Sequence, residues 1–307
     1  MKTKLKLLKE EISKQLIGHS DMLDALLIGL FTDGHILLEG VPGLAKTTAV
    51  NALAKALNLN FKRVQFTPDL LPSDIIGAEI YDVKSGDFKI KHGPVFTNLL
   101  LADEINRAPA KVQSALLEVM QEKQVTIGDE SFLIEKPFLV LATQNPIEQE
   151  GAYSLPEAQL DRFMFKVVVG YNSPEQELEI AEKAATASFQ EINAVLTKED
   201  LANIKEEVKN IHIDTELKEY IVTLIFATRE RHKYIEYGAS PRATIDMLKA
   251  VKARAYLRGN EYVKPSDIVL CAKDILRHRI KLSYEAIADG MTPDTVIEAL
   301  LQSVPVP

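Results

Sequence analysis

Apolar and polar positions follow two rhythms along the first 170 residues of the chain. Short apolar runs that end in polar residues predict buried strands, and they alternate with longer stretches of helical periodicity. Strands and helices in this order predict a parallel sheet covered by helices on both faces. The predicted strands are HILLEG (35–40), FKRVQFT (61–67), NLLLADE (98–104), FLVLATQ (138–144) and FKVVVG (165–170), and the main helices are AKTTAVNALAKALN (45–58) and PAKVQSALLEVMQEKQ (109–124).

Two stretches of alternating polarity interrupt this order. They turn at Ser85-Gly86 and at Gly128-Asp129, and both predict β-hairpins. Helical periodicity also fills the first 30 residues, where Ser20 or Asp21 could cap a second helix.

The character of the sequence changes after Ser173-Pro174. From there to the C-terminus the pattern is helical, with almost no strand signal. We therefore predict an α/β domain over residues 1–188 and a smaller all-helical domain over residues 189–307.

Composition narrows the class of protein. The chain is 46% hydrophobic and 26% charged, which is typical of a globular protein rather than a disordered one. Its net charge of −8 argues against a broad surface for nucleic acids or anionic membranes. The single Cys271 excludes an internal disulfide, and no signal peptide or membrane span is recognisable, so we expect a cytoplasmic protein. The six histidines show no spacing typical of a zinc site.

The stretch GVPGLAKTT (40–48) connects a predicted strand to a predicted helix, which is where a phosphate-binding loop occurs. It nearly matches G-x-x-x-x-G-K-[ST], in which backbone N–H groups surround a polyphosphate. Lys46 would contact the β- and γ-phosphates, and Thr47 would hold Mg²⁺. Alone, the stretch would also fit a solvated turn whose lysine has no special role. The other loop residues expected to bind nucleotide are Gly40, Val41, Pro42, Gly43, Leu44, Ala45 and Thr48.

Ala45 departs from this pattern, because it stands where the pattern has glycine. The position lies where the loop becomes a helix, and glycine costs up to about 1 kcal/mol relative to alanine in a helix interior. We therefore predict a negative φ at Ala45, which alanine adopts without strain. A positive φ would contradict this explanation.

Two adjacent carboxylates end the predicted strand NLLLADE. Asp103 and Glu104 should lie at the carboxyl edge of the sheet, beside the phosphate-binding loop. Asp103 could position Mg²⁺ through water, while Glu104 polarises the water that attacks the γ-phosphate. Alone, the pair could also cap the next helix. Together with the loop, it predicts a magnesium–triphosphate site.

Three further side chains could complete such a site. Asn145 follows a predicted strand in LATQNP and could orient the attacking water, although an ordinary Asn-Pro turn would look the same. Arg162 follows a short predicted helix, and Arg242 begins a helix in the second domain. Arginines stabilise charge on the γ-phosphate, often from a neighbouring subunit, although a single arginine is more often part of a surface ion pair.

The combination of GVPGLAKT, LLLADEINRAP, ATQNP, EAQLDRF and GASPRA strongly resembles the MoxR family of AAA+ ATPases. The resemblance covers nearly the whole chain, from LIGHSD to ILRHRI. It implies a P-loop NTPase fold of the AAA+ type, with a parallel sheet between helices and a smaller all-helical lid domain. It also implies an ATPase that uses ATP and Mg²⁺.

The resemblance assigns roles to individual residues. Lys46 and Thr47 would be the Walker A residues, Asp103 and Glu104 the Walker B pair, Asn145 sensor 1, Arg162 an arginine finger acting in trans, and Arg242 sensor 2. Ile17 and Gly18 match the position where such proteins hold adenine. Asn106 and Arg107 could couple Glu104 to the neighbouring subunit or cap a helix. Binding of ATP would close the lid onto the nucleotide through Arg242.

The resemblance also implies partners. The arginine finger requires a homo-oligomeric ring, usually a hexamer. Family members act as chaperone-like remodellers that mature protein complexes, often by metal or cofactor insertion, and frequently work with proteins that carry a von Willebrand factor A domain. The two predicted hairpins match inserts that face a central pore and contact a client protein.

Two alternative functions stay open at this stage. A nucleic-acid motor or loader would use the lysines of the first hairpin, Lys84, Lys89 and Lys91, but only Phe88 accompanies them as an aromatic, and the chain is acidic overall. A binding module switched by ATP without appreciable turnover would not need Glu104, Asn145 and Arg162.

Overall fold

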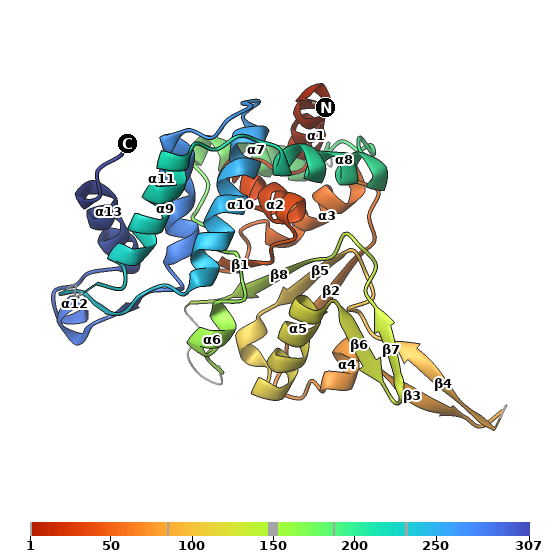
Figure 1. Cartoon of the computed structure of the whole chain (residues 1–307). Helices are drawn as coiled ribbons and strands as arrows, with labels where there is room; N and C mark the ends of the chain where they lie inside the picture. Colours follow the sequence, from red (N-terminus) through yellow and green to blue (C-terminus); the bar gives the residue numbers. More distant parts are fainter. Residues whose placement is uncertain (1, 85, 147–152, 187, 231–232) are drawn as a thin grey trace.

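The computed structural model describes residues 2–84, 86–146, 153–186, 188–230 and 233–307. A five-stranded sheet in the order β2-β5-β8-β1-β9 forms its centre, and every neighbouring pair is parallel (Figure 1). The predicted parallel sheet is therefore confirmed. Its strands are β1 (Ile36–Glu39), β2 (Phe61–Gln65), β5 (Leu99–Asp103), β8 (Leu139–Gln144) and β9 (Phe165–Val168).

Both faces of this sheet are buried. Along β5, Leu99 and Leu101 belong to one hydrophobic cluster, whereas Leu100 and Ala102 belong to a second. Successive side chains of a strand point to opposite faces, so the uninterrupted apolar run serves two cores at once. The first face is covered by α1 (Lys2–Ser13), α2 (Ser20–Thr32) and α3 (Lys46–Ala56), and the second by α4 (Pro72–Ile76) and α5 (Ala110–Glu122).

The start of α2 differs from the prediction. The residue that precedes the helix is His19, with a φ of 53°, and no side chain caps this end. Gly18, just before it, has a φ of 72°. Two consecutive left-handed residues turn the chain directly into the helix, so Ser20 is already helical and neither Ser20 nor Asp21 is the cap.

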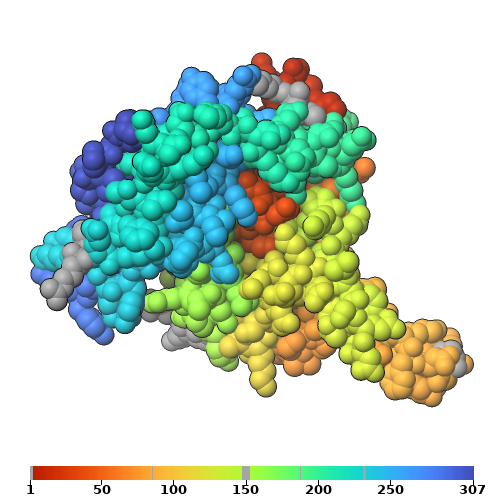
Figure 2. Space-filling view, in the orientation of Figure 1, coloured from red at the N-terminus to blue at the C-terminus, as the bar shows by residue number. Residues whose placement is uncertain are grey.

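Both predicted hairpins are confirmed. Strands β3 (Gly77–Asp82) and β4 (Asp87–His92) pair antiparallel, as do β6 (Gln124–Ile127) and β7 (Glu130–Leu133). Ser85, at the predicted turn of the first hairpin, lies outside the described residues. The β3–β4 hairpin extends away from the body of the protein as an arm (Figures 1 and 2).

The C-terminal part consists mainly of helices, as predicted, but it also contains a two-stranded antiparallel sheet of β10 (Ile235–Tyr237) and β11 (Lys281–Leu282). These strands are too short to give an alternating pattern. The helices are α7 (Pro174–Ala185), which precedes the predicted boundary at residue 188, and then α8 (Lys198–Lys209), α9 (Thr215–Ala227), α10 (Pro241–Leu257), α11 (Pro265–Leu276), α12 (Tyr284–Ala288) and α13 (Pro293–Ser303).

The lid helices share a hydrophobic core with the first face of the sheet. Both α8 and α10 contact α2, and their buried side chains belong to the same cluster as those of α1 to α3 (Figure 1). The lid is therefore attached to the sheet domain through α2, and α11 also contacts β9. Within the described part of the chain, no helix is both long and apolar enough to cross a membrane.

Candidate nucleotide-binding site

A cavity of about 350 Å³ opens at the carboxyl ends of β1, β2, β5 and β8, and we call it the phosphate pocket. Ligands of open parallel sheets bind at this edge, at the point where the order of the strands reverses. Strand β1 marks this point, because β8 lies on one side of it and β9, the next strand of this sheet along the chain, lies on the other. The phosphate pocket is lined by Gly40, Pro42, Gly43, Leu44, Ala45, Lys46, Thr47, Thr48, Arg63, Gln65, Asp103, Glu104, Thr143 and Asn145.

Most of the predicted loop residues therefore line one pocket. Val41 is the exception, because its side chain packs against the hydrophobic core. Helix α3 begins at Lys46, as the pattern predicts, so the positive end of its dipole faces the pocket.

The backbone at Ala45 contradicts the sequence-based expectation. Ala45 has a φ of 53° and a ψ of 17°, in the left-handed region. Its carbonyl nevertheless accepts the N–H of Ala49 at 2.9 Å, which is the first hydrogen bond of α3. The loop thus holds residue 45 in the left-handed conformation, which glycine, the residue of the pattern, adopts without steric cost. For alanine this conformation costs about 1 kcal/mol or more.

Lys46 lies half-buried between the loop and the two acids. Its Nζ donates to the carbonyl oxygen of Gly40 at 2.5 Å. Burial lowers the pKa of Lys46, while the charges of Asp103 and Glu104 act in the opposite direction. Lys46 thus lies within the field of both acids.

Asp103 is held by two side chains that the sequence reasoning missed. The Thr143 hydroxyl donates to Asp103 Oδ1 at 2.6 Å, and the Arg63 guanidinium pairs with Asp103 Oδ2, also at 2.6 Å. Arg63 comes from β2 and Thr143 from β8, the strands on either side of β5. Their contribution depends on which strands are neighbours, and this does not follow from sequence spacing.

Glu104 is also fixed from several directions. Its backbone lies in the left-handed region, with a φ of 55°, and its N–H donates to Thr143 Oγ1 at 2.8 Å. Gln65 Nε2 donates to its carboxylate at 2.8 Å, and Arg107 Nη1 does so at 3.0 Å. Left-handed backbone conformations at residues other than glycine are concentrated at functional sites. Arg107 lies on the short 3₁₀ helix η1 (Ile105–Arg107), and through its hydrogen bond it contacts the predicted catalytic acid directly.

Asn145 is buried at the end of β8 and lines the phosphate pocket together with Glu104. Asn106, which follows Glu104 by two residues, is buried, and its carbonyl oxygen accepts the N–H of Tyr153 at 2.6 Å. Asn106 does not line the phosphate pocket.

The oxygen donors of the phosphate pocket suit Mg²⁺. Thr47 supplies a hydroxyl and Asp103 a carboxylate, both on the lining of the same cavity. Mg²⁺ is held in such sites by one or two protein oxygens together with phosphates and water. No group of three or more acidic, histidine or cysteine side chains that could hold a metal by themselves occurs among the described residues.

The two predicted arginines lie together, but outside the phosphate pocket. Arg162 and Arg242 line a separate cavity of about 290 Å³, which we call the arginine pocket. Arg242 Nη1 pairs with Asp161 at 3.4 Å, and Asp161 also accepts from Ser240 and Arg279. Arg242 therefore lines the arginine pocket and not the phosphate pocket of its own chain, and α10, the helix that carries it, packs on α2. The closing of the lid through Arg242 when ATP binds stays a prediction.

Ile17 and Gly18 lie beside the start of α7. They line a cavity of about 450 Å³ together with residues of that helix, among them Gln176 and Glu179. A β-carbon on Gly18 would lie 2.4 Å from the side-chain oxygen of Asn172, which would have to move, and the φ of 72° at Gly18 disfavours any residue with a β-carbon.

Comparisons with known proteins match both parts of the chain. A family model described as "ATPase family associated with various cellular activities (AAA)" matches residues 35–165, and a model of the AAA lid domain matches residues 227–300. Together these models cover four of the five strands of the sheet, the phosphate pocket and most of the lid.

Full-length relatives are also similar to this chain. The chaperone MoxR1 of Mycobacterium tuberculosis is 47% identical over 305 residues, which cover 97% of this chain and 81% of that protein. Protein MoxR of Methylorubrum extorquens is 28% identical, with coverages of 97% and 94%. The crystal structure of a candidate ATPase from Cytophaga hutchinsonii superimposes with a TM-score of 0.94 at 50% identity, covering 100% of this chain and 96% of that one.

Proposed function

Because the chain belongs to the MoxR family of AAA+ ATPases, we propose that it binds ATP with Mg²⁺ and hydrolyses it to ADP and phosphate. One observation carries this proposal. The phosphate loop with Lys46 and Thr47 shares a single pocket with Asp103 and Glu104, which come from a different strand. A triphosphate and its cation need these two halves together.

Each side chain has a distinct part in the proposed reaction. The loop N–H groups and Lys46 bind the phosphates, and Thr47 and Asp103 hold Mg²⁺, which supplies charge neutralisation when bound. Glu104 accepts a proton from the attacking water, and Asn145 orients that water. Arg63 pairs with Asp103, the carboxylate that would hold the cation, and Gln65 and Arg107 position the carboxylate of Glu104.

We further propose that the arginines act on the nucleotide of a neighbouring copy. Arg162 and Arg242 both line the arginine pocket, and neither lines the phosphate pocket of their own chain. Both could then stabilise the γ-phosphate in trans, which requires a homo-oligomeric ring, and we expect a hexamer.

The work of this ring would be chaperone-like remodelling of a protein client, in which complexes mature by insertion of metals or cofactors. The β3–β4 hairpin supports a client-binding role, because it extends from the body and leaves large apolar side chains exposed (Figure 2). These are Ile80, Tyr81, Val83 and Phe88. A partner with a von Willebrand factor A domain is part of the same proposal.

One observation favours the alternative function of a nucleic-acid motor, and another counts against it. From the sequence we predicted that Phe88 is the only aromatic beside the hairpin lysines, but Tyr81 lies opposite Phe88 in the register, with ring centroids 5.3 Å apart. That statement was therefore wrong. However, Lys89 is neutralised by Asp82 at 2.5 Å, which weakens the cationic surface that a single strand needs.

Replacement of Glu104 by glutamine tests the proposed activity. Glu104→Gln keeps the side-chain volume and removes the base, so ATP binding should persist while turnover falls by about 10² to 10⁴-fold. Equilibrium binding of ATP and release of phosphate measure the two effects separately.

Two controls accompany this variant. Lys46→Ala should lose both binding and turnover, whereas Glu122→Gln, an exposed carboxylate at the end of α5, should behave as the wild type. Full turnover by Glu104→Gln would remove Glu104 from the mechanism. Wild-type protein that binds ATP without releasing phosphate would instead indicate a nucleotide-switched binding module.

A further inference from the structure

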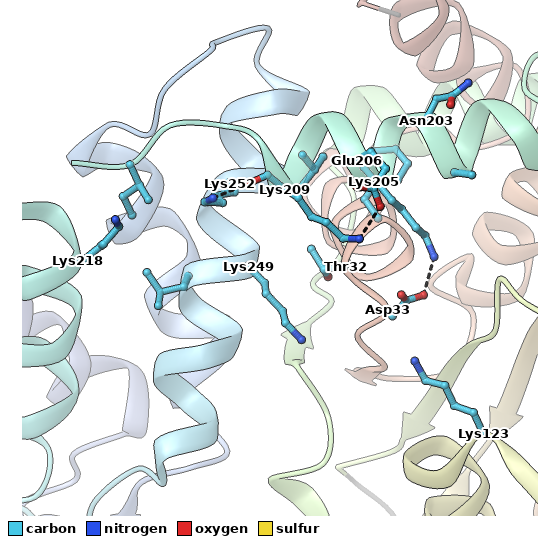
Figure 3. A pocket seen from close by; sticks show the side chains of 15 residues that line it. Thr32, Asp33, Lys123, Asn203, Lys205, Glu206, Lys209, Lys218, Lys249 and Lys252 are labelled. Atoms are coloured by element: carbon cyan, nitrogen blue, oxygen red, sulfur yellow. Dashed lines mark hydrogen bonds and ion pairs between the residues drawn. The ribbon is translucent and has the colours of Figure 1, made fainter. Parts of the chain in front are cut away.

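A large cavity lies away from the phosphate pocket, where the lid meets the sheet domain. It has a volume of about 780 Å³ and lies between the end of α2 and the helices α8, α9 and α10 (Figure 3). We call it the lysine cleft, because six of the residues that line it are lysines. They are Lys123, Lys205, Lys209, Lys218, Lys249 and Lys252.

The cleft has fewer negative than positive charges. Its two carboxylates are already engaged, Asp33 with Lys205 and Glu206 with Lys209, each at 2.5 Å. Among the described residues, no ion pair is found for Lys218 or Lys249, whose side chains extend from α9 and α10 (Figure 3). A local excess of positive charge in a protein of net charge −8 indicates a site for an anionic partner.

Neighbouring amines disfavour one another's charge in this cleft. Burial lowers the pKa of Lys123, and Lys136, Lys205 and Lys249 lower it further. The pKa of Lys252 is lowered by burial and by Lys218. Carboxylates entering the cleft would relieve this repulsion.

The lining is not only cationic. Phe31, Val208, Ile213 and Leu248 also line the cleft. A small inorganic anion would leave this apolar surface uncovered. The cleft therefore suits a partner that presents apolar side chains and carboxylates together, such as an acidic amphipathic helix.

The chain itself carries a helix of this kind. Helix α7 has the sequence PEQELEIAEKAA and no buried residue, and Leu178 is 61% exposed. Glu175, Leu178 and Glu182 are spaced by three and by four residues, so they lie on one face of the helix. This face points away from the body, because the less exposed Gln176, Ile180 and Lys183 lie on the opposite side.

The helix does not fill the cleft of its own chain. None of the residues lining the lysine cleft belongs to α7. Helix α7 lies instead beside Ile17 and Gly18, the residues expected to hold adenine. Two complementary surfaces on one chain that do not meet within it can meet between copies.

The position of the cleft agrees with contact between copies. The lysine cleft and the arginine pocket share Asp33, Lys123 and Lys249, so the two cavities adjoin. The proposed function places the arginine pocket against the nucleotide of a neighbour, and α7 borders the adenine end of that nucleotide site. The two surfaces therefore belong to the two sides of one head-to-tail interface.

We propose that α7 of one copy docks into the lysine cleft of the next copy. Carboxylates of Glu175 and Glu182 pair with Lys218 and Lys249, and Leu178 covers the apolar floor. This inference rests on the ring of the proposed function and adds a second contact that holds the lid of one subunit to the sheet domain of its neighbour.

Charge reversal on each side tests this contact. The cleft variant is Lys218→Glu/Lys249→Glu, and the helix variant is Glu175→Lys/Glu182→Lys. Each should weaken ATP-dependent assembly at least about 10-fold, measured by sedimentation, because like charges then face each other across the interface. An equimolar mixture, and a chain carrying all four substitutions, should regain assembly.

Several controls make the outcome interpretable. Lys6→Glu/Lys264→Glu changes the net charge by the same amount as the cleft variant, at exposed positions outside the lysine cleft, and should assemble as the wild type. Thermal unfolding should confirm that every variant is folded. ATP binding by the isolated subunits should be unchanged, because none of the four substituted residues lines the phosphate pocket or the cavity beside Ile17 and Gly18.

The outcomes separate this inference from the proposed function. If the wild type assembles and hydrolyses ATP but both charge variants assemble equally well, the docking of α7 is overturned while the ATPase stands. Loss of assembly without recovery in the mixture also overturns it, and loss of client binding alone would make the cleft a client site. A wild type that stays monomeric with ATP contradicts both the ring and the docking.

Discussion

The backbone at residue 45 is strained, and the sequence alone did not indicate this strain. The φ of 53° at Ala45 costs an alanine more than a glycine, whereas glycine has more freedom to lose on folding. We predict that Ala45→Gly raises the free energy of unfolding by up to about 1 kcal/mol. Urea unfolding of the nucleotide-free protein measures this change.

The matched control for this prediction is Ala54→Gly in α3, the helix that begins directly after residue 45. It should lower the free energy of unfolding by about 1 kcal/mol or more, because helical glycine is unfavourable and a buried methyl group is lost. If Ala45→Gly destabilises the protein as Ala54→Gly does, the left-handed conformation at residue 45 does not hold in solution.

Other residues of the site show how far sequence reasoning reaches. Lys46, Thr47, Asp103, Glu104 and Asn145 were predicted from local patterns, because each follows a strand whose end the sequence marks, and all five line the phosphate pocket. No local sequence pattern distinguishes Arg63, Gln65 and Thr143 as residues of the site. They reach the acids only because β2, β5 and β8 are neighbours, and this pairing is a property of the folded sheet.

At the scale of elements, His35 connects three parts of the fold. It precedes β1, its Nδ1 accepts the N–H of Val140 on β8, and its Nε2 donates to the carbonyl oxygen of Met120 on α5, both at 3.0 Å. With these partners the ring is neutral. Burial is the main reason that its pKa is lowered from 6.5 to about 4.

Stability should therefore fall on acidification. The unfolded chain binds a proton at His35 below pH 6.5, whereas the folded protein does so only near pH 4, so stability is lost as the pH falls through this interval. His35 alone should account for about 3 kcal/mol. Urea unfolding as a function of pH measures the effect, and His35→Gln should give a shallower dependence. Equal slopes for the two proteins would contradict the assignment.

The β3–β4 hairpin is anchored at its base and exposed further out. At the base, His92 packs against Phe96 and Phe132, with centroid distances of 4.1 and 5.0 Å. Towards the tip, Val83 is 84% and Phe88 68% exposed. These two side chains contribute little to folding and remain available for a partner.

We predict that Val83→Ser/Phe88→Ser changes the free energy of unfolding by no more than about 0.5 kcal/mol. The buried Val125→Ser in β6 should in contrast cost about 2 kcal/mol or more. Urea unfolding distinguishes the two cases. A large loss from the hairpin variant would mean that its apolar side chains pack on the body in solution.

At the scale of the whole molecule, the orientation of the lid could not be predicted from the sequence. The pattern predicts that Arg242 begins a helix, which the structure confirms, but not which surface that helix packs on. The shared core with α2 and the ion pairs of Asp161 direct Arg242 to the arginine pocket. Among the described residues, no arginine of the lid lines the phosphate pocket of its own chain.

Mixed rings provide the test of this division between copies. Arg162→Ala keeps an intact phosphate pocket, whereas Glu104→Gln keeps an intact arginine pocket, and each alone should hydrolyse ATP slowly. In an equimolar mixture, a quarter of the interfaces pair an intact phosphate pocket with an intact arginine pocket if subunits mix at random. We therefore predict that turnover recovers to about a quarter of the wild-type rate. Lys46→Ala mixed with Glu104→Gln should not recover, because both lack a working phosphate pocket. Failure of the first mixture, in rings shown to exchange subunits, would mean that Arg162 does not act on a neighbour's nucleotide.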